Sequence, residues 1–83
     1  MDLSDRDRAI LDFERSWWTR QGAKEDAIRR ELRISGTRYY QLLGALVDAP
    51  AAFVYDPLTV KRFRRDRDRR RRLRVEGRQV RPR

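Results

Sequence analysis

The fold is decided by the stretch from Ala27 to Leu46, which reads AIRRELRISGTRYYQLLGAL. Apolar residues recur there at helical spacing in two groups that a short turn separates. The first group predicts a helix over about residues 24–32, and the second a helix over about residues 37–47. The expected inward residues are Ala27, Ile28, Leu32, Tyr39, Leu43 and Leu46, with Val47 extending the face and Leu42 bordering it.

The turn between the two helices carries two further signals. Ile34 is an aliphatic residue suited to lock the helices at a steep angle, and Ser35 is suited to cap the second helix. This combination is typical of a helix-turn-helix. Arg33 departs from the pattern, because many such turns have glycine there. A plain helical hairpin within a small bundle is the alternative.

The outward side of the second helix carries residue types that suit a DNA major groove. Arg38 can donate two hydrogen bonds to guanine, and Gln41 can pair with adenine. Thr37 and Tyr40 can reach phosphates or a thymine methyl group, and glycine permits close approach of the backbone. The expected recognition residues are Gly36, Thr37, Arg38, Tyr40 and Gln41, with Gly44 on the same side.

An N-terminal helix is predicted from Ser4, as the cap, to about Thr19. Acidic residues in its first turn favour the positive end of the helix dipole. Its apolar face contains Ile10, Phe13 and Trp17, and we expect Trp17 in the core. Trp18 lies at the edge of this face, so core packing and a stacking platform for bases both stay open for it.

A break at residues 48–50 and a short turn to about residue 53 precede a last helix, which should begin at Pro57 after the cap Asp56. We expect Leu58, Val60 and Phe63 to anchor its first turns. From residue 64 to 72 it has no apolar residue, so no core should hold that part. Pairs of Asp66 with Arg70 and of Asp68 with Arg72 should support it. Disorder is expected past Leu73, given Gly77 and Pro82.

Positive charge is concentrated at the C-terminal end. Residues 1–57 hold nine Lys and Arg against ten Asp and Glu, a net charge of −1, whereas residues 58–83 hold thirteen against three, a net charge of +10. We therefore expect a helical domain over 1–63 and an arginine-rich extension over 64–83. Arginine binds phosphate bidentately, so the expected phosphate contacts are Lys61, Arg62, Arg64, Arg65, Arg67, Arg69, Arg70, Arg71, Arg72 and Arg74.

Composition excludes several classes of protein. The 83 residues include no cysteine and no histidine, so neither disulfides nor the commonest zinc ligand and general base are available. An enzyme is thus the least favoured interpretation, and no cofactor or metal is expected. The arginine run lacks the apolar face that a membrane-surface helix buries, and no segment approaches the ~20 apolar residues of a span. We expect a cytoplasmic protein associated with the nucleoid.

The chain resembles a small actinobacterial family known only as a domain of unknown function. The resemblance covers about residues 9–66, and its most specific part is Thr37-Arg38-Tyr39-Tyr40-Gln41. Further matching positions are Trp17-Trp18, Gly22-Ala23-Lys24-Glu25, Ala27-Ile28-Arg29, Ser35, Leu43, Leu46-Val47-Asp48, Asp56-Pro57-Leu58, Val60 and Arg62. The resemblance implies a helix-turn-helix-like protein of an actinobacterial cytoplasm and supplies no established activity.

The residues favour an all-α protein that binds double-stranded DNA, as a transcriptional regulator or a nucleoid-associated factor. The alternative is an adaptor that docks on RNA polymerase or a sigma factor through exposed aromatic residues. An RNA-binding basic helix is a third interpretation. Helix-turn-helix proteins commonly dimerise, so a homodimer stays open, although no uncommitted apolar stripe is long enough to define a dimer face.

Overall fold

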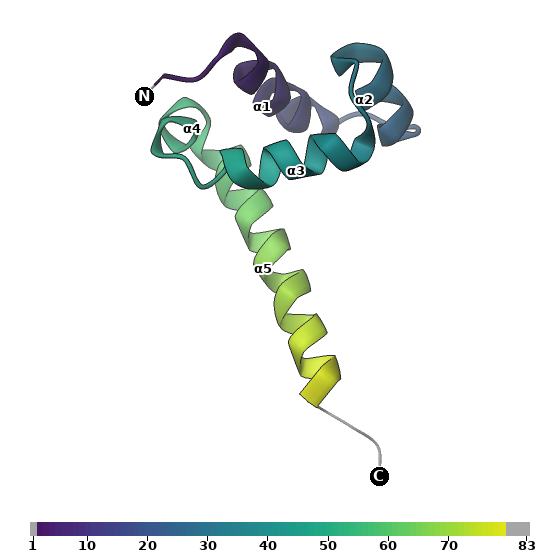
Figure 1. Ribbon diagram of the computed structural model, residues 1–83, viewed down its shortest axis with the longest axis vertical. Coiled ribbons are helices and arrows are strands. Elements are labelled where there is room, and N and C mark those ends of the chain that lie inside the picture. The colour runs from purple at the N-terminus through teal and green to yellow at the C-terminus, as the bar shows by residue number, and fades with distance from the viewer. Residues whose placement is uncertain (1, 80–83) are drawn as a thin grey trace.

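The computed structural model describes the backbone of residues 2–79 and the side chains of residues 2–73, and it is all-helical as predicted (Figure 1). Its elements are α1 (Asp5–Trp17), α2 (Lys24–Leu32), α3 (Gly36–Leu46), α4 (Pro50–Tyr55) and α5 (Pro57–Gln79). The two helices of the fold-deciding stretch match their predicted bounds within one residue. The first helix is shorter than predicted and ends at Trp17 rather than Thr19, and the expected turn after Pro50 is a short helix.

Side-chain caps fix where three of these helices begin. The Ser4 hydroxyl accepts a hydrogen bond from the Asp7 amide at 3.0 Å, and the Asp7 carboxylate accepts one from the Ser4 amide at 3.1 Å. Ser35 caps α3 in the same way, since its hydroxyl accepts from the Arg38 amide at 3.0 Å. Asp56 accepts from the Thr59 amide at 3.3 Å at the start of α5. The predicted caps are therefore confirmed, each satisfying an amide that the helix leaves free.

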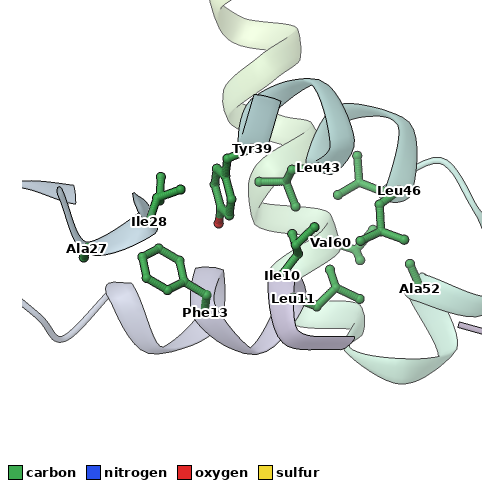
Figure 2. Packing of buried hydrophobic residues seen from close by; sticks show 11 residues of the cluster. Ile10, Leu11, Phe13, Ala27, Ile28, Tyr39, Leu43, Leu46, Ala52 and Val60 are labelled. Atoms are coloured by element: carbon green, nitrogen blue, oxygen red, sulfur yellow. The ribbon is translucent and has the colours of Figure 1, made fainter. Parts of the chain in front are cut away.

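The core lies where α1, α2 and α3 meet and continues to the α4–α5 junction. Figure 2 shows Tyr39 close to Phe13 and Ile28 at one end, and Val60 and Ala52 close to Leu46 at the other. The buried hydrophobic residues are Ile10, Leu11, Phe13, Ala27, Ile28, Tyr39, Leu43, Leu46, Val47, Ala52 and Val60. Each predicted inward residue of the stretch from Ala27 to Leu46 lies in this core or packs against it.

Trp17 of α1 and the aliphatic residue of the turn line the edge of the core, whereas Trp18 does not. Trp17, predicted in the core, is half-buried and packs against it, stacking on Phe13 with ring centroids 5.6 Å apart. Ile34 is half-buried and packs against the core from the turn between α2 and α3. Trp18 is exposed, with 48% of its surface accessible. Of the two interpretations of Trp18, core packing is therefore wrong.

A buried polar cluster ties α1, α2 and α3 together. Glu14 Oε1 accepts hydrogen bonds from the Tyr39 hydroxyl at 2.5 Å and from Lys24 Nζ at 2.9 Å. Burial and the adjacent Glu14 carboxylate raise the pKa of Tyr39 far above its usual range. Tyr39 therefore stays protonated and remains a hydrogen-bond donor.

The last helix, α5, begins in the globular part and projects away from it (Figure 1). Its 23 residues span about 34 Å at the usual helical rise. Two expectations are corrected here. Leu58 does not anchor the helix, because 70% of its surface is exposed, while Val60 is fully buried and Phe63 partly so. The helix also runs past Leu73 to Gln79, and the disorder expected for residues 80–83 lies outside the described residues.

None of the helices within residues 2–79 is both long and apolar enough to cross a bilayer. Among the side chains described, no three acidic groups gather closely enough to hold a metal ion.

Candidate nucleic-acid interface

The outward side of α3 presents most of the predicted recognition residues. Thr37, Arg38, Tyr40 and Gln41 are exposed, whereas Gly36 is buried. The side chain of Glu25 covers Gly36, because a Cβ built there would lie 3.1 Å from Glu25 Cγ. Gly36 therefore offers no backbone surface to a partner, and its assignment to the recognition set is wrong.

Tyr40 lies on the side of α3 that faces α5. Its ring meets Tyr39 edge-on at 5.0 Å, and Lys24 Nζ lies 5.2 Å from its centroid. These contacts hold the ring in place while 39% of its surface stays accessible. A ring fixed on one side and open on the other can present its hydroxyl and its edge to a ligand.

The arginine helix is held at the C-terminal end of α3, which the sequence did not suggest. Arg64 Nε donates a hydrogen bond to the Val47 carbonyl at 2.9 Å. Arg67 donates to both carboxylate oxygens of Asp48 at 3.3 Å, and more weakly to the Gly44 carbonyl at 3.4 Å. The last carbonyls of a helix lack intrahelical partners and favour cations, so both arginines satisfy them.

This anchor adds to one expectation and corrects another. As expected, no core residue holds the segment 64–72, but polar contacts with the end of α3 do. Arg64 and Arg67 are committed to those contacts and are not free phosphate ligands, which corrects their assignment to the phosphate arm. The hydrogen bond from Arg67 lowers the pKa of the Asp48 carboxylate, with nearby Arg64 and Arg71 acting in the same direction.

The remaining cations of the predicted arm differ in their surroundings. The Arg62 guanidinium lies 4.0 Å from the Trp18 ring centroid, and Arg69 pairs with Asp66 at 3.3 Å. The predicted pairs with Arg70 and Arg72 are absent among the described side chains, where Asp68 pairs with Arg67 instead. The side chain of Arg74 lies outside the described residues. Exposed cations of the arm are Lys61, Arg65, Arg69, Arg70, Arg71 and Arg72.

The crossing of α3 and α5 encloses a groove of about 290 Å³. Sequence reasoning missed this groove, although three arginines at positions 67, 70 and 71 have the spacing of one helical face. The sequence did not show which element this face of α5 meets, because the contacts of Arg64 and Arg67 with Val47, Asp48 and Gly44 are between distant segments. We call it the α3–α5 groove, and its lining residues are Tyr40, Gly44, Phe63, Arg67, Arg70 and Arg71.

Together these features define a small all-helical protein with a strongly cationic helix fixed to its globular part. The chain belongs to the family described as protein of unknown function DUF3263, which matches residues 2–75. The predicted membership in a family of unknown function is thus confirmed, and the actinobacterial origin stays a prediction. Neither a curated protein nor a solved structure matches the chain.

Proposed function

We propose that this protein binds double-stranded DNA without catalysing a reaction, as a transcriptional regulator or a nucleoid-associated factor. In this proposal α2, the turn and α3 act as a helix-turn-helix, and α3 enters the major groove. Exposed arginines of α5 lie along the phosphate backbone. RNA could accept the same charges, but its deep, narrow major groove would not admit α3.

The anchor between α5 and α3 is the observation that carries the proposal. Arg64 and Arg67 donate their hydrogen bonds to the end of α3, at 2.9 Å to Val47 and 3.3 Å to Asp48. They thereby hold the exposed arginines further along α5 in a defined direction from α3. A solvated charge run would need no such contact, whereas a two-part DNA contact needs both parts held together.

The exposed side chains of α3 supply the chemistry for contact with bases. Arg38 and Gln41 are the two side chains there that can pair bidentately with a base edge, to guanine and adenine respectively. These two base-reading side chains of α3 are outnumbered by the exposed cations of α5 that can bind phosphate. We therefore propose modest sequence specificity on top of a large electrostatic affinity.

Fluorescence anisotropy with labelled duplex DNA, single strands and structured RNA at several salt concentrations tests the proposal. If about six phosphates are neutralised, the logarithm of the association constant should fall against the logarithm of salt with a slope of about −5. Arg38→Ala and Gln41→Ala should reduce the differences in affinity among duplex sequences. A slope near zero, or preference for structured RNA over duplex, would refute the proposal.

A second candidate function is docking on RNA polymerase or a sigma factor. It is favoured by apolar surface at the α4–α5 junction, where Val54 is 81% exposed and Leu58 70% exposed, beside Phe53 and Tyr55. Val54→Asp and Leu58→Asp should abolish binding to purified polymerase or sigma factor while leaving duplex affinity unchanged if docking is the function. If both variants still bind polymerase and sigma factor as the wild type does, this candidate function is rejected.

A further inference from the structure

The α3–α5 groove has the chemistry of a phosphate site. Three of its six lining residues are arginines, and none is a carboxylate. We infer that this groove binds one phosphodiester group of the DNA backbone, next to the place where α3 contacts the DNA. The identity of the ligand rests on the proposed function, whereas the site itself rests on the groove.

Two of the three arginines are available for a ligand. Arg67 is engaged by Asp48, but Arg70 and Arg71 have no carboxylate within ion-pair distance among the side chains of residues 2–73. Arg70 and Arg71 are adjacent on α5, and both line the groove. Two guanidinium groups that converge on one hollow can bind the same phosphate, each through charge-assisted hydrogen bonds.

Tyr40 adds a neutral donor at the opposite wall. Its hydroxyl makes no hydrogen bond to any of the described residues, although its ring is held by Tyr39 and Lys24. A phosphate oxygen accepts readily from a tyrosine hydroxyl. The groove therefore offers donors from both helices, which a general cationic surface on α5 alone would not do.

Gly44 leaves the floor of the groove open. A Cβ built at this position would have no atom within 4 Å, so the packing of α3 against α5 does not require glycine. Glycine within a helix is unfavourable relative to alanine. The open space is consistent with a ligand group that approaches the α3 backbone closely.

The groove continues into a second hollow that can guide the rest of the strand. The two share Tyr40, Phe63 and Arg70, and the second hollow is also lined by Trp17 and Trp18, by Lys24, and by the carboxylates of Glu14 and Asp66. A strand with its phosphate between Arg70 and Arg71 would place the adjoining sugar against these aromatic rings.

The test compares two double variants that each remove two positive charges. Arg70→Gln with Arg71→Gln removes the groove cations, and Arg65→Gln with Arg72→Gln removes two arginines from the opposite face of α5. We expect the groove variant to bind duplex DNA at least about tenfold more weakly than the control variant. Its salt slope should also be shallower than that of the wild type by about 1, as expected when one phosphate fewer is neutralised. Equal affinities of the two double variants would overturn the inference.

A second pair of variants separates charge from size. Gly44→Glu and Gly44→Gln place side chains of equal length on the groove floor, where a Cβ meets no atom within 4 Å, and circular dichroism of both checks that they fold alike. Gly44→Glu should bind duplex at least about tenfold more weakly than Gly44→Gln, because its carboxylate repels phosphate and neutralises the arginines. Equal affinities of the two would also overturn the inference.

Titration of the full chain with inorganic phosphate tests the site without DNA. The amide signals of Tyr40 and Gly44 should shift in NMR spectra of the wild type and stay fixed in the Arg70→Gln, Arg71→Gln variant. Absence of shifts in the wild type would overturn the phosphate site. Shifts in a wild type that has no duplex affinity would instead refute the proposed function and leave a site for a smaller phosphate compound.

Discussion

Arg67 of α5 forms an ion pair with Asp48, two residues beyond the end of α3, with guanidinium nitrogens 3.3 Å from both carboxylate oxygens. Asp48 thereby joins the negative end of the α3 dipole in holding a cation. The contact turns an arginine-rich helix that has little apolar surface into a fixed part of the molecule. Removing it should affect the direction of α5 more than the stability of the core.

Asp48→Asn should release α5 without unfolding the protein. Arg67 holds the pKa of the Asp48 carboxyl below its usual range, so the pair stabilises the folded state above about pH 4. That stabilisation is lost as pH falls through the lowered pKa. The protection factors of the amides of residues 64–73, which are the intrinsic exchange rates at each pH divided by the observed rates, should therefore fall in acid for the wild type and be low at every pH for Asp48→Asn. Asp68→Asn, which contacts Arg67 within α5 only, serves as the control and should keep wild-type protection at neutral pH.

Arg33→Gly should stabilise the protein by about 0.5–1 kcal/mol. Arg33 ends α2 with φ 62° and ψ 33°, the left-handed conformation that side chains disfavour and glycine adopts freely. Arg30→Gly removes the same charge from a helical position of α2, so it should instead destabilise by about 1 kcal/mol. Urea unfolding of both variants measures the difference. Equal effects would show that the left-handed backbone at Arg33 carries no strain.

Gly44→Ala should raise the free energy of unfolding by up to about 1 kcal/mol, because alanine favours the helix and its Cβ meets no atom within 4 Å. Gly36→Ala is the matched control, since its Cβ would lie 3.1 Å from Glu25 Cγ and force that side chain to move. The gain at Gly36 should therefore be smaller or absent. Thermal melting of the two variants compares them directly, and a less stable Gly44→Ala variant would contradict the open space at this site.

Leu43→Ala should destabilise the protein by about 2–5 kcal/mol, because Leu43 of α3 is fully buried in the core and its truncation leaves a cavity. Its neighbour Leu42 is only half-buried, so Leu42→Ala should cost clearly less. Chemical denaturation followed by circular dichroism measures both. Equal destabilisation by the two substitutions would mean that the face of α3 is wrongly assigned.

Local patterns made much of the fold predictable. The apolar spacing of α2 and α3 identified their inward faces, and Ser4, Ser35 and Asp56 marked helix starts through short-range hydrogen bonds. Many helix-turn-helix turns have glycine at the position of Arg33, and the structure shows why, because Arg33 adopts a left-handed conformation. These features depend on residues within one or two turns of each other, so sequence alone contains them.

Contacts between distant segments were not predictable in the same way. Leu58 has the right type for a core residue, but it lies two positions before Val60 on α5 and so on the other side of the helix, and the side that meets the core is that of Val60. The roles of Arg64 and Arg67 depend on where α3 ends in space, 17 residues earlier for Arg64 and Val47. The α3–α5 groove follows from that crossing, so the arginine run suggested phosphate binding but not which arginines converge.

The hydrogen bond from the Tyr39 hydroxyl to Glu14 should make the free energy of unfolding depend on pH in alkaline solution. Burial and the Glu14 carboxylate raise the pKa of Tyr39 in the folded protein, whereas the unfolded chain ionises this tyrosine near pH 10. The resulting stabilisation is therefore complete below about pH 10 and declines above it, as the unfolded state releases a proton that the folded state keeps.

Tyr39→Phe removes this donor and should cost about 1.5–3 kcal/mol at pH 7, because a buried carboxylate loses a hydrogen bond. Lysine titration is common to both proteins and cancels in their difference. The stability advantage of the wild type should hence shrink above pH 10 by up to about 1.4 kcal/mol per pH unit. Urea unfolding between pH 7 and 11 measures it, with Tyr40→Phe as a pH 7 control that removes an exposed hydroxyl. A difference between wild type and Tyr39→Phe that stays constant through pH 11 would mean that the Tyr39 proton is not held by Glu14.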